Sequence, residues 1–321
     1  MLSCKLITLI GNSKAKSTLA AWISGGRLPH AILIEGALGS GRATFAKILA
    51  GVILCDNEDN RPCGVCRHCV KVDKGIHPDF EIKRGGGGKR SFHTEAVREV
   101  RAGAFVRPNE ADARVFLLAD AQNMSVQAQN ALLKIIEEPP RGVHFILTCE
   151  TRGQLLPTIQ SRTAAVTLEA PDIRECEEYL CEQFPDASPE DISAAASRAG
   201  GNIGQACAFL SDESIRREYE AAHSALCSLI IGDELSALEY FYAFERSREA
   251  FIHSLKLIRS AAVSFLPSAV PRVFADTGRP ALSPSRAMQI IDIVDEAVIS
   301  AEANAGIPLL TLSLCGKIAD N

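Results

Sequence analysis

The sequence predicts a P-loop-type α/β domain, a parallel sheet with flanking helices, followed by helical domains. Two stretches carry the prediction for the sheet: residues 30–49 have the pattern of a buried strand, a glycine-rich turn and a helix, and residues 115–120 have that of a second buried strand ending in an acid. Residues 212–321 are nearly all helical by pattern. A chain of 321 residues is long enough for two or three such domains.

The turn after the first strand has the glycines of a phosphate-binding loop but lacks two of its chemical groups. The pattern G-x-x-x-x-G-K-[ST] fits Gly36 to Ala43, with glycines also at Gly39 and Gly41. Arg42 stands where a lysine should reach the phosphates, and Ala43 has no hydroxyl for Mg²⁺. This predicts a nucleotide-binding element that has lost hydrolysis, with an ordinary glycine-rich turn as the alternative.

The second strand ends at Asp120, the position from which P-loop NTPases hold Mg²⁺. A working site usually has a glutamate directly afterwards as the base that activates water, and this chain has Ala121 there. The lysine, the hydroxyl and the base are therefore all missing from one predicted site. Three losses together are stronger evidence for lost hydrolysis than any one of them alone.

Four cysteines between these two stretches have the spacing of a metal site. Cys63, Cys66 and Cys69 form a CxxCxxC run, and Cys55 precedes it by eight residues. Four thiolates on tight turns can close a tetrahedral Zn²⁺ site, so we predict structural zinc. An iron–sulfur cluster and unliganded thiols are the alternatives. His68 lies inside the run and is expected to face solvent, since four cysteines suffice as ligands.

Composition limits the classes of function. The net charge of −5 argues against non-specific nucleic-acid binding by the isolated chain. The start of the sequence lacks the features of a signal peptide, and no apolar run approaches the roughly 18 residues of a membrane span. We therefore expect a cytoplasmic protein without membrane contact. Its other seven cysteines are expected to be small core residues and not disulfides.

Residues 83–114 are rich in basic side chains. They form either a solvated face interleaved with acids or a surface that contacts phosphates within a larger assembly. Four successive glycines at 85–88 predict a mobile, exposed loop. The remaining elements expected in the first domain are a helix ending at 25–26, a helix at 42–54, a strand near 77–82, a helix at 95–104, a helix at 128–138, a strand at 144–149 and a short helix ending at 158–162.

The order of the motifs resembles the AAA+ clamp-loader subunits of bacterial DNA polymerase III. The segments that carry this resemblance are LPHAILIEGALGSGR, the four-cysteine insert, HPDF, TEAVREVR, VFLLADAQNMSVQAQNALLKIIEEPP and LLPTIQSR. Within that family the eroded P-loop is similar to the delta-prime branch and unlike the ATP-hydrolysing gamma/tau branch. The resemblance implies an AAA+ domain over 1–168 with a zinc insert at 55–79, a helical lid over 169–211 and an all-α collar over 212–321.

The resemblance also implies roles for single residues. The four cysteines match the family's zinc ligands, and Ser161-Arg162 matches its SRC motif, whose arginine reaches the ATP of a neighbouring subunit. Thr163 replaces the last cysteine of that motif, and Gly204 stands where the lid normally carries a sensor arginine. If Arg162 is not such a finger, a surface pair with a carboxylate such as Glu169 is the alternative.

The expected function is a non-hydrolysing subunit of the polymerase holoenzyme that helps load the sliding clamp onto primed DNA. Its expected partners are the gamma/tau and delta subunits and, through the assembled complex, the clamp and DNA. A weakly active ATPase in which Arg42 replaces the lysine is the competing enzyme hypothesis. A zinc-dependent nucleic-acid binder fits poorly with the net charge and with the lack of aromatic–basic interleaving near the cysteines.

Overall fold

The computed structural model describes residues 9–84, 94–263, 265 and 282–319, and the chain divides into two compact units, residues 1–171 and 172–321. Each unit has its own hydrophobic core. The glycine loop expected at 85–88 lies outside the described residues.

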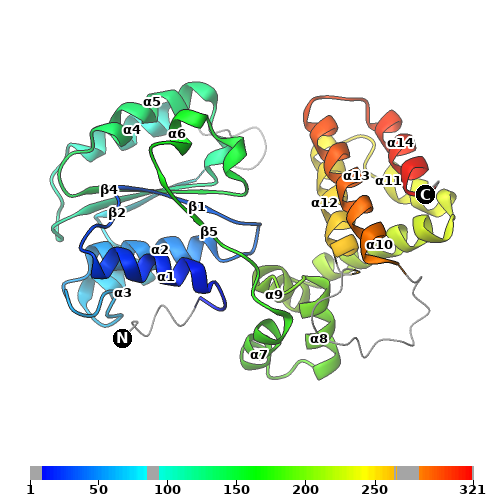
Figure 1. Cartoon of the computed structure of the whole chain (residues 1–321), viewed down its shortest axis with the longest axis horizontal. Helices are drawn as coiled ribbons and strands as arrows, with labels where there is room; N and C mark the ends of the chain where they lie inside the picture. The colour runs from blue at the N-terminus through cyan, green and yellow to red at the C-terminus, as the bar shows by residue number, and fades with distance from the viewer. Residues whose placement is uncertain (1–8, 85–93, 264, 266–281, 320–321) are drawn as a thin grey trace. The chain divides into compact units, whose positions relative to one another are not determined.

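The first unit is built on a five-stranded sheet in which every pairing between strands is parallel (Figure 1). The order of the strands is β2-β3-β4-β1-β5. Their bounds are β1 (Ala31–Glu35), β2 (Phe80–Arg84), β3 (Arg114–Ala119), β4 (Val143–Cys149) and β5 (Ala164–Thr167). The apolar runs seen in the sequence become β1, β3 and β4, which are buried because both faces of the sheet are covered.

Helices cover the two faces of the sheet and form a separate core on each (Figure 1). One face packs against α1 (Ser13–Ser24), α2 (Arg42–Leu54) and α3 (Arg67–Asp73). The other packs against α4 (Thr94–Ala104), α5 (Val126–Glu137) and α6 (Pro157–Gln160). Short 3₁₀ turns, η2 (Ala121–Asn123) and η3 (Arg152–Gln154), follow β3 and β4.

The structure confirms the α/β prediction, with small shifts at the ends of elements. Strand β2 begins at Phe80, three residues after the start expected near residue 77, and α5 begins at Val126, two residues before its expected start. Ser125 explains the start of α5, because its hydroxyl accepts a hydrogen bond from the backbone N–H of Ala128 and so caps the helix there.

The parallel arrangement brings the ends of distant strands to one edge of the sheet. The turn at Gly36 leaves β1 and Asp120 leaves β3, with β4 between them. The carboxyl ends of parallel strands are where ligands bind in open α/β sheets. The residues singled out as a nucleotide site therefore share that edge.

The second unit is entirely helical among its described residues. Its helices are α7 (Ile173–Gln183), α8 (Pro189–Arg198), α9 (Ile203–Ser211), α10 (Glu213–Ile231), α11 (Glu234–Tyr242), α12 (Arg248–Val263), α13 (Pro284–Glu302) and α14 (Ile307–Ala319). Ser188 caps α8 through the N–H of Asp191, with Pro189 in the first turn, as the sequence predicts. The separation into a lid and a collar stays a prediction.

Candidate functional site

The loop after β1 has the backbone of a phosphate-binding loop. Gly41 precedes α2 with a φ of 91°, a left-handed conformation that favours glycine. A Cβ at Gly36 would lie 2.5 Å from Oγ of Ser40 and 3.0 Å from the carbonyl oxygen of Leu168, so a side chain would not fit there. The glycines recognised in the sequence are therefore required by the local geometry.

Arg42 is buried at the start of α2 and faces the acid at the end of β3. Its side chain is 7% exposed, and Nη2 lies 3.3 Å from Oδ1 of Asp120. Asp120 has a φ of 57°, and its backbone N–H donates to the hydroxyl of Thr148 on β4 at 3.0 Å. A guanidinium thus faces the carboxylate at the position from which a P-loop NTPase holds Mg²⁺. The sequence placed these two residues at one site, and the structure pairs them directly.

Two further polar atoms of this loop are buried without a hydrogen-bond partner among the described residues: Nη1 of Arg42 and Oγ of Ser40. Ala43 and the fully buried Ala121 offer methyl groups where a hydroxyl and a base would stand. The edge of the sheet therefore keeps the shape of a nucleotide site, but its groups for metal binding and water activation are absent at these positions.

Arg162 follows α6 and lies at the surface, with 38% of its side chain exposed. Its Nε lies 2.5 Å from Oε1 of Glu137, the last residue of α5. Its Nη1 donates to the carbonyl oxygen of Thr158 at 3.0 Å and to the hydroxyl of Ser161 at 3.2 Å. The exposure expected for Arg162 is confirmed.

The alternative expected for Arg162, a surface ion pair with a carboxylate, is present, but the partner is Glu137 and not Glu169. Glu169 lies 3.6 Å from Nζ of Lys14 instead.

Sequence reasoning did not single out Gln129, which joins α5 to the segment carrying Arg162. This buried amide donates from Nε2 to the carbonyl oxygen of Met124 and accepts the N–H of Leu156 at 2.8 Å. The turn after β3 and the start of α6 are therefore fastened to one side chain. A lone glutamine in an amphipathic helix gives no signal of this role.

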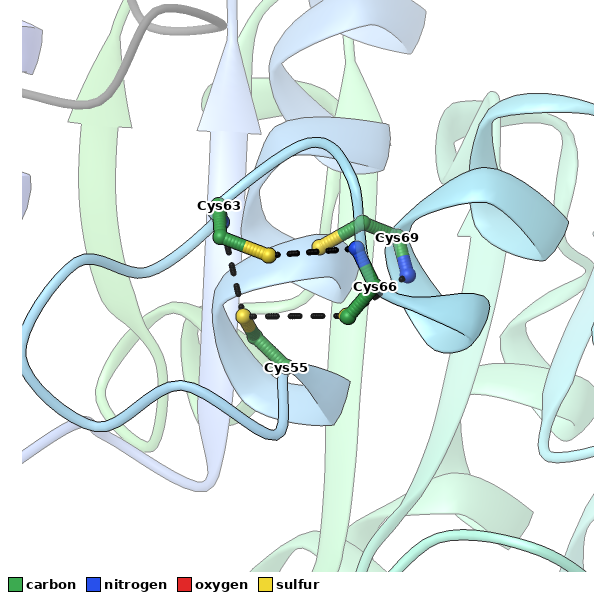
Figure 2. Close-up of side chains that lie close together, drawn as sticks. All are labelled: Cys55, Cys63, Cys66 and Cys69. Atoms are coloured by element: carbon green, nitrogen blue, oxygen red, sulfur yellow. Dashed lines mark hydrogen bonds between the residues drawn. The ribbon is translucent and has the colours of Figure 1, made fainter.

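The four cysteines come together between the end of α2 and the first turn of α3, which contains Cys69 (Figure 2). Their Sγ atoms all lie within 4.8 Å of one another, and those of Cys55 and Cys66 are 4.0 Å apart. Tetrahedral Zn–S bonds of about 2.3 Å place sulfurs roughly 3.8 Å apart, so the cluster is close to the size that zinc needs. The four residues can therefore hold a metal ion, as the spacing predicts.

Backbone N–H groups point at the sulfurs of this knuckle. The N–H of Cys63 donates to Sγ of Cys55, that of Cys66 to Cys63, and that of Cys69 to Cys66, at 3.3–3.4 Å. Burial alone raises the pKa of Cys63, but the N–H groups of Cys66 and Val65 outweigh it and lower that pKa to about 7. Burial raises the pKa of Cys69. A cation favours the thiolate form of all four ligands, because its charge stabilises the anion.

The prediction that His68 faces solvent is wrong. Its side chain is 1% exposed and belongs to a chain of hydrogen bonds. The N–H of Asp79 donates to Nδ1 of His77, so the proton of a neutral His77 is on Nε2, which donates to Nδ1 of His68 at 2.7 Å. Nε2 of His68 lies 3.2 Å from Oδ1 of Asp56. Nε of Arg67 also lies 3.2 Å from this nitrogen and 3.8 Å from Oδ2 of Asp56.

The two histidines and Glu110 are also close enough to hold a metal, with ligand atoms within 4.8 Å of one another. Metal on Nε2 of His77 would require the proton on Nδ1, where it would face the N–H of Asp79. Glu110 in turn pairs with Lys71 at 2.5 Å. This cluster is therefore a structural hydrogen-bond network that connects the knuckle to the start of β2.

Asp79 lies at the other end of that hydrogen-bond network. Its fully buried carboxylate accepts the backbone N–H groups of Asn109, Glu110 and Ala111 at 2.6, 2.8 and 3.1 Å. Burial raises the pKa of Asp79, but these hydrogen bonds outweigh it and hold the pKa below its usual range. The side chain thereby ties the turn before β2 to the loop before β3.

The basic stretch is partly paired with acids. Lys83 lies 2.7 Å from Glu99 and 3.0 Å from Glu81, and Glu99 raises its pKa. Arg98 and Arg101 are exposed on α4 and make no ion pair with a described residue. Among the described residues of this stretch, Lys83 is therefore paired with acids, whereas Arg98 and Arg101 are exposed.

The parallel sheet, the P-loop turn after β1 and the acid after β3 define the first unit as a P-loop-type α/β domain. Residues 11–172 match the family described as "DNA polymerase III, delta subunit". This match covers half of the chain, and the chain therefore belongs to that family. The clamp-loader resemblance of the motifs is confirmed. Among the described helices, none has the length and apolar character needed to cross a bilayer.

Individual relatives agree with this family. The "DNA polymerase III subunit delta'" of Yersinia pestis is 29% identical over 64% of this chain and 60% of that protein. The "DNA polymerase III subunit gamma/tau" of Mycobacterium bovis is 30% identical over 60% of this chain and 34% of that protein. The chain thus spans less than two thirds of either relative. A solved gamma subunit-related protein from Thermotoga maritima is 16% identical over 95% of this chain and 98% of that chain, with a TM-score of 0.42.

Proposed function

We propose that this chain is a delta-prime-type subunit of the DNA polymerase III clamp loader that does not hydrolyse ATP itself. In this proposal it assembles with gamma/tau and delta subunits in the cytoplasm and helps load the sliding clamp onto primed DNA. Membership of the DNA polymerase III delta subunit family supports this placement. Similarity to both delta' and gamma/tau relatives supports a place in the same complex.

The observation that carries the non-hydrolysing role is the pair formed by Arg42 and Asp120. The buried guanidinium lies 3.3 Å from the carboxylate, so Mg²⁺ would have to displace a cation that is part of the fold. With Ala43 and Ala121 beside it, the site has neither a side-chain hydroxyl for the metal nor a carboxylate base at these positions. Nucleotide hydrolysis by this chain would need all three deficits to be overcome.

Arg162 gives such a subunit a role in a neighbour's reaction. An arginine supplied in trans stabilises charge on a transferring phosphoryl group, and such fingers are worth ~10³–10⁵ in rate in GTPases. Arg162 is exposed at the end of a short helix, and its guanidinium is already fixed by contacts within its own chain. A fixed and exposed guanidinium can meet a nucleotide bound by an adjacent subunit without first being ordered.

We assign zinc to the four-cysteine knuckle in a structural role. All four positions of a tetrahedral site are supplied by protein sulfur, which leaves no open position for a substrate. The exposed arginines of α4 are available for phosphate contacts once the subunit is part of an assembly on DNA.

A weakly active ATPase is the competing proposal, because the P-loop glycines and the positive charge at Arg42 are retained. Titration of the purified chain with a fluorescent ATP analogue and Mg²⁺, together with an assay for released phosphate, separates the two proposals. We expect no turnover above the buffer rate. Turnover that increases with protein purity and disappears in Asp120→Ala would establish the ATPase instead.

A further inference from the structure

Contacts within the chain hold two of the three guanidinium nitrogens of Arg162, Nε and Nη1. Nε faces Oε1 of Glu137 at 2.5 Å, and Nη1 donates to the carbonyl of Thr158 and the hydroxyl of Ser161. Nη2 has no partner among the residues that the structure describes. We propose that Glu137 is a positioning residue that fixes Arg162 with Nη2 free for a phosphate oxygen. This inference rests on the proposed finger role of Arg162.

The place of Glu137 in the fold supports a purpose beyond local stability. It is the last residue of α5, where the helix dipole disfavours a carboxylate, and the chain turns away immediately afterwards at Pro139. A glutamate at this position does not stabilise the helix unless it pairs with a cation. The cation that it meets is the one residue of this segment with a proposed role in catalysis.

Helix α5 also holds the other end of the same segment. Gln129 accepts the N–H of Leu156 just before α6, and Glu137 contacts Arg162 just after it. Two attachments from one helix fix both the position and the rotation of α6. Arg162 and Glu137 are both about 40% exposed, and an ion pair so open to water contributes little to folding stability. Its loss should therefore affect the orientation of Arg162 far more than the fold.

The test uses the assembled clamp loader with Glu137→Gln in this chain. The other ATP sites are silenced by alanine at their P-loop lysines, so that hydrolysis reports the site that Arg162 faces. Displacing a catalytic group slightly can cost up to ~100-fold, and we expect kcat to fall roughly tenfold with little change in KM for ATP. Glu138→Gln is the matched control, because this neighbouring carboxylate is exposed and makes no ion pair with a described residue.

A double-mutant cycle separates positioning from a structural effect. Glu137→Gln should have no further effect when Arg162 is already alanine, because a positioning residue acts only through the group it positions. An equal loss in that background, or an equal loss from Glu138→Gln, would overturn the proposal. If Arg162→Ala lowers kcat and Glu137→Gln does not, the positioning role fails and the finger stands. If Arg162→Ala is itself without effect, both fail.

Discussion

Asp79 offers a quantitative test of how the region around the knuckle is held together. We consider the substitution Asp79→Asn, which keeps the size of the side chain and one carbonyl oxygen. The carboxylate accepts three backbone N–H groups and the side-chain amide of Asn109, and it is fully buried. The new amide group would turn an N–H donor toward part of this cluster of donors, so some of them would lose their acceptor.

The cost follows from the number of donors and from their access to water. A buried donor without an acceptor costs ~1–3 kcal/mol. Asn109 and Glu110 are exposed residues, so water can reach part of the loop, and we expect a total loss of ~2–3 kcal/mol instead of the full sum.

The loss should depend on pH with a definite sign. The folded pKa of Asp79 lies below the ordinary value of about 4. The contribution of Asp79 is therefore complete above that ordinary value and is lost as the pH falls through the folded pKa. The stabilities of the wild type and of Asp79→Asn should converge in acid.

Trp22 makes the measurement specific to the first unit. It is the only tryptophan of the chain and lies in α1, so its fluorescence during urea denaturation reports unfolding of the sheet domain. Asp112→Asn serves as the control, because Asp112 is exposed nearby in the loop after Ala111. A change of less than ~0.5 kcal/mol at pH 7 for Asp79→Asn, or an unchanged gap between the two proteins in acid, would refute this account of Asp79.

Two further predictions concern the knuckle. The purified chain should contain about one Zn²⁺ by elemental analysis, and Cys66→Ser should lose it while Cys181→Ser, at an exposed cysteine of α7, retains it. Iron absorbance in the visible range, or a metal-free chain of full stability, would contradict this. His77→Ala should speed zinc release to a chelator about tenfold, because the hydrogen bond between His77 and His68 would be lost. Release at the wild-type rate would mean that the histidine pair does not support the metal site.

The elements that sequence could predict are those whose cause is local. The run from Ala31 to Ile34 is apolar enough to define a buried strand, and the cysteine spacing alone defines a compact cluster. His68 was misjudged because its partner, His77, lies nine residues away across a turn, and no local pattern signals that their rings meet.

The partner of Arg162 could not be inferred from the sequence for a similar reason. Glu137 is brought to it by the packing of α6 against α5, and the sequence offers several equivalent carboxylates. The pair between Arg42 and Asp120 needed the strand order, since β4 separates the two strands that carry the P-loop and the acid. The sequence thus predicted which residues belong to the site, whereas the ion pairs that these residues form could be found only from the structure.

The central claim is that this chain acts on a neighbour's nucleotide without hydrolysing its own. The most direct measurement is the clamp- and DNA-stimulated ATPase of an assembled loader in which only this subunit carries Arg162→Ala, beside a complex with Arg141→Ala at an exposed arginine of the same domain. We expect Arg162→Ala to preserve assembly, since one exposed side chain adds little to a large interface, and to lower the ATPase rate and clamp loading partially. Equal rates in the two complexes would contradict the claim and leave the chain as a passive member of the assembly.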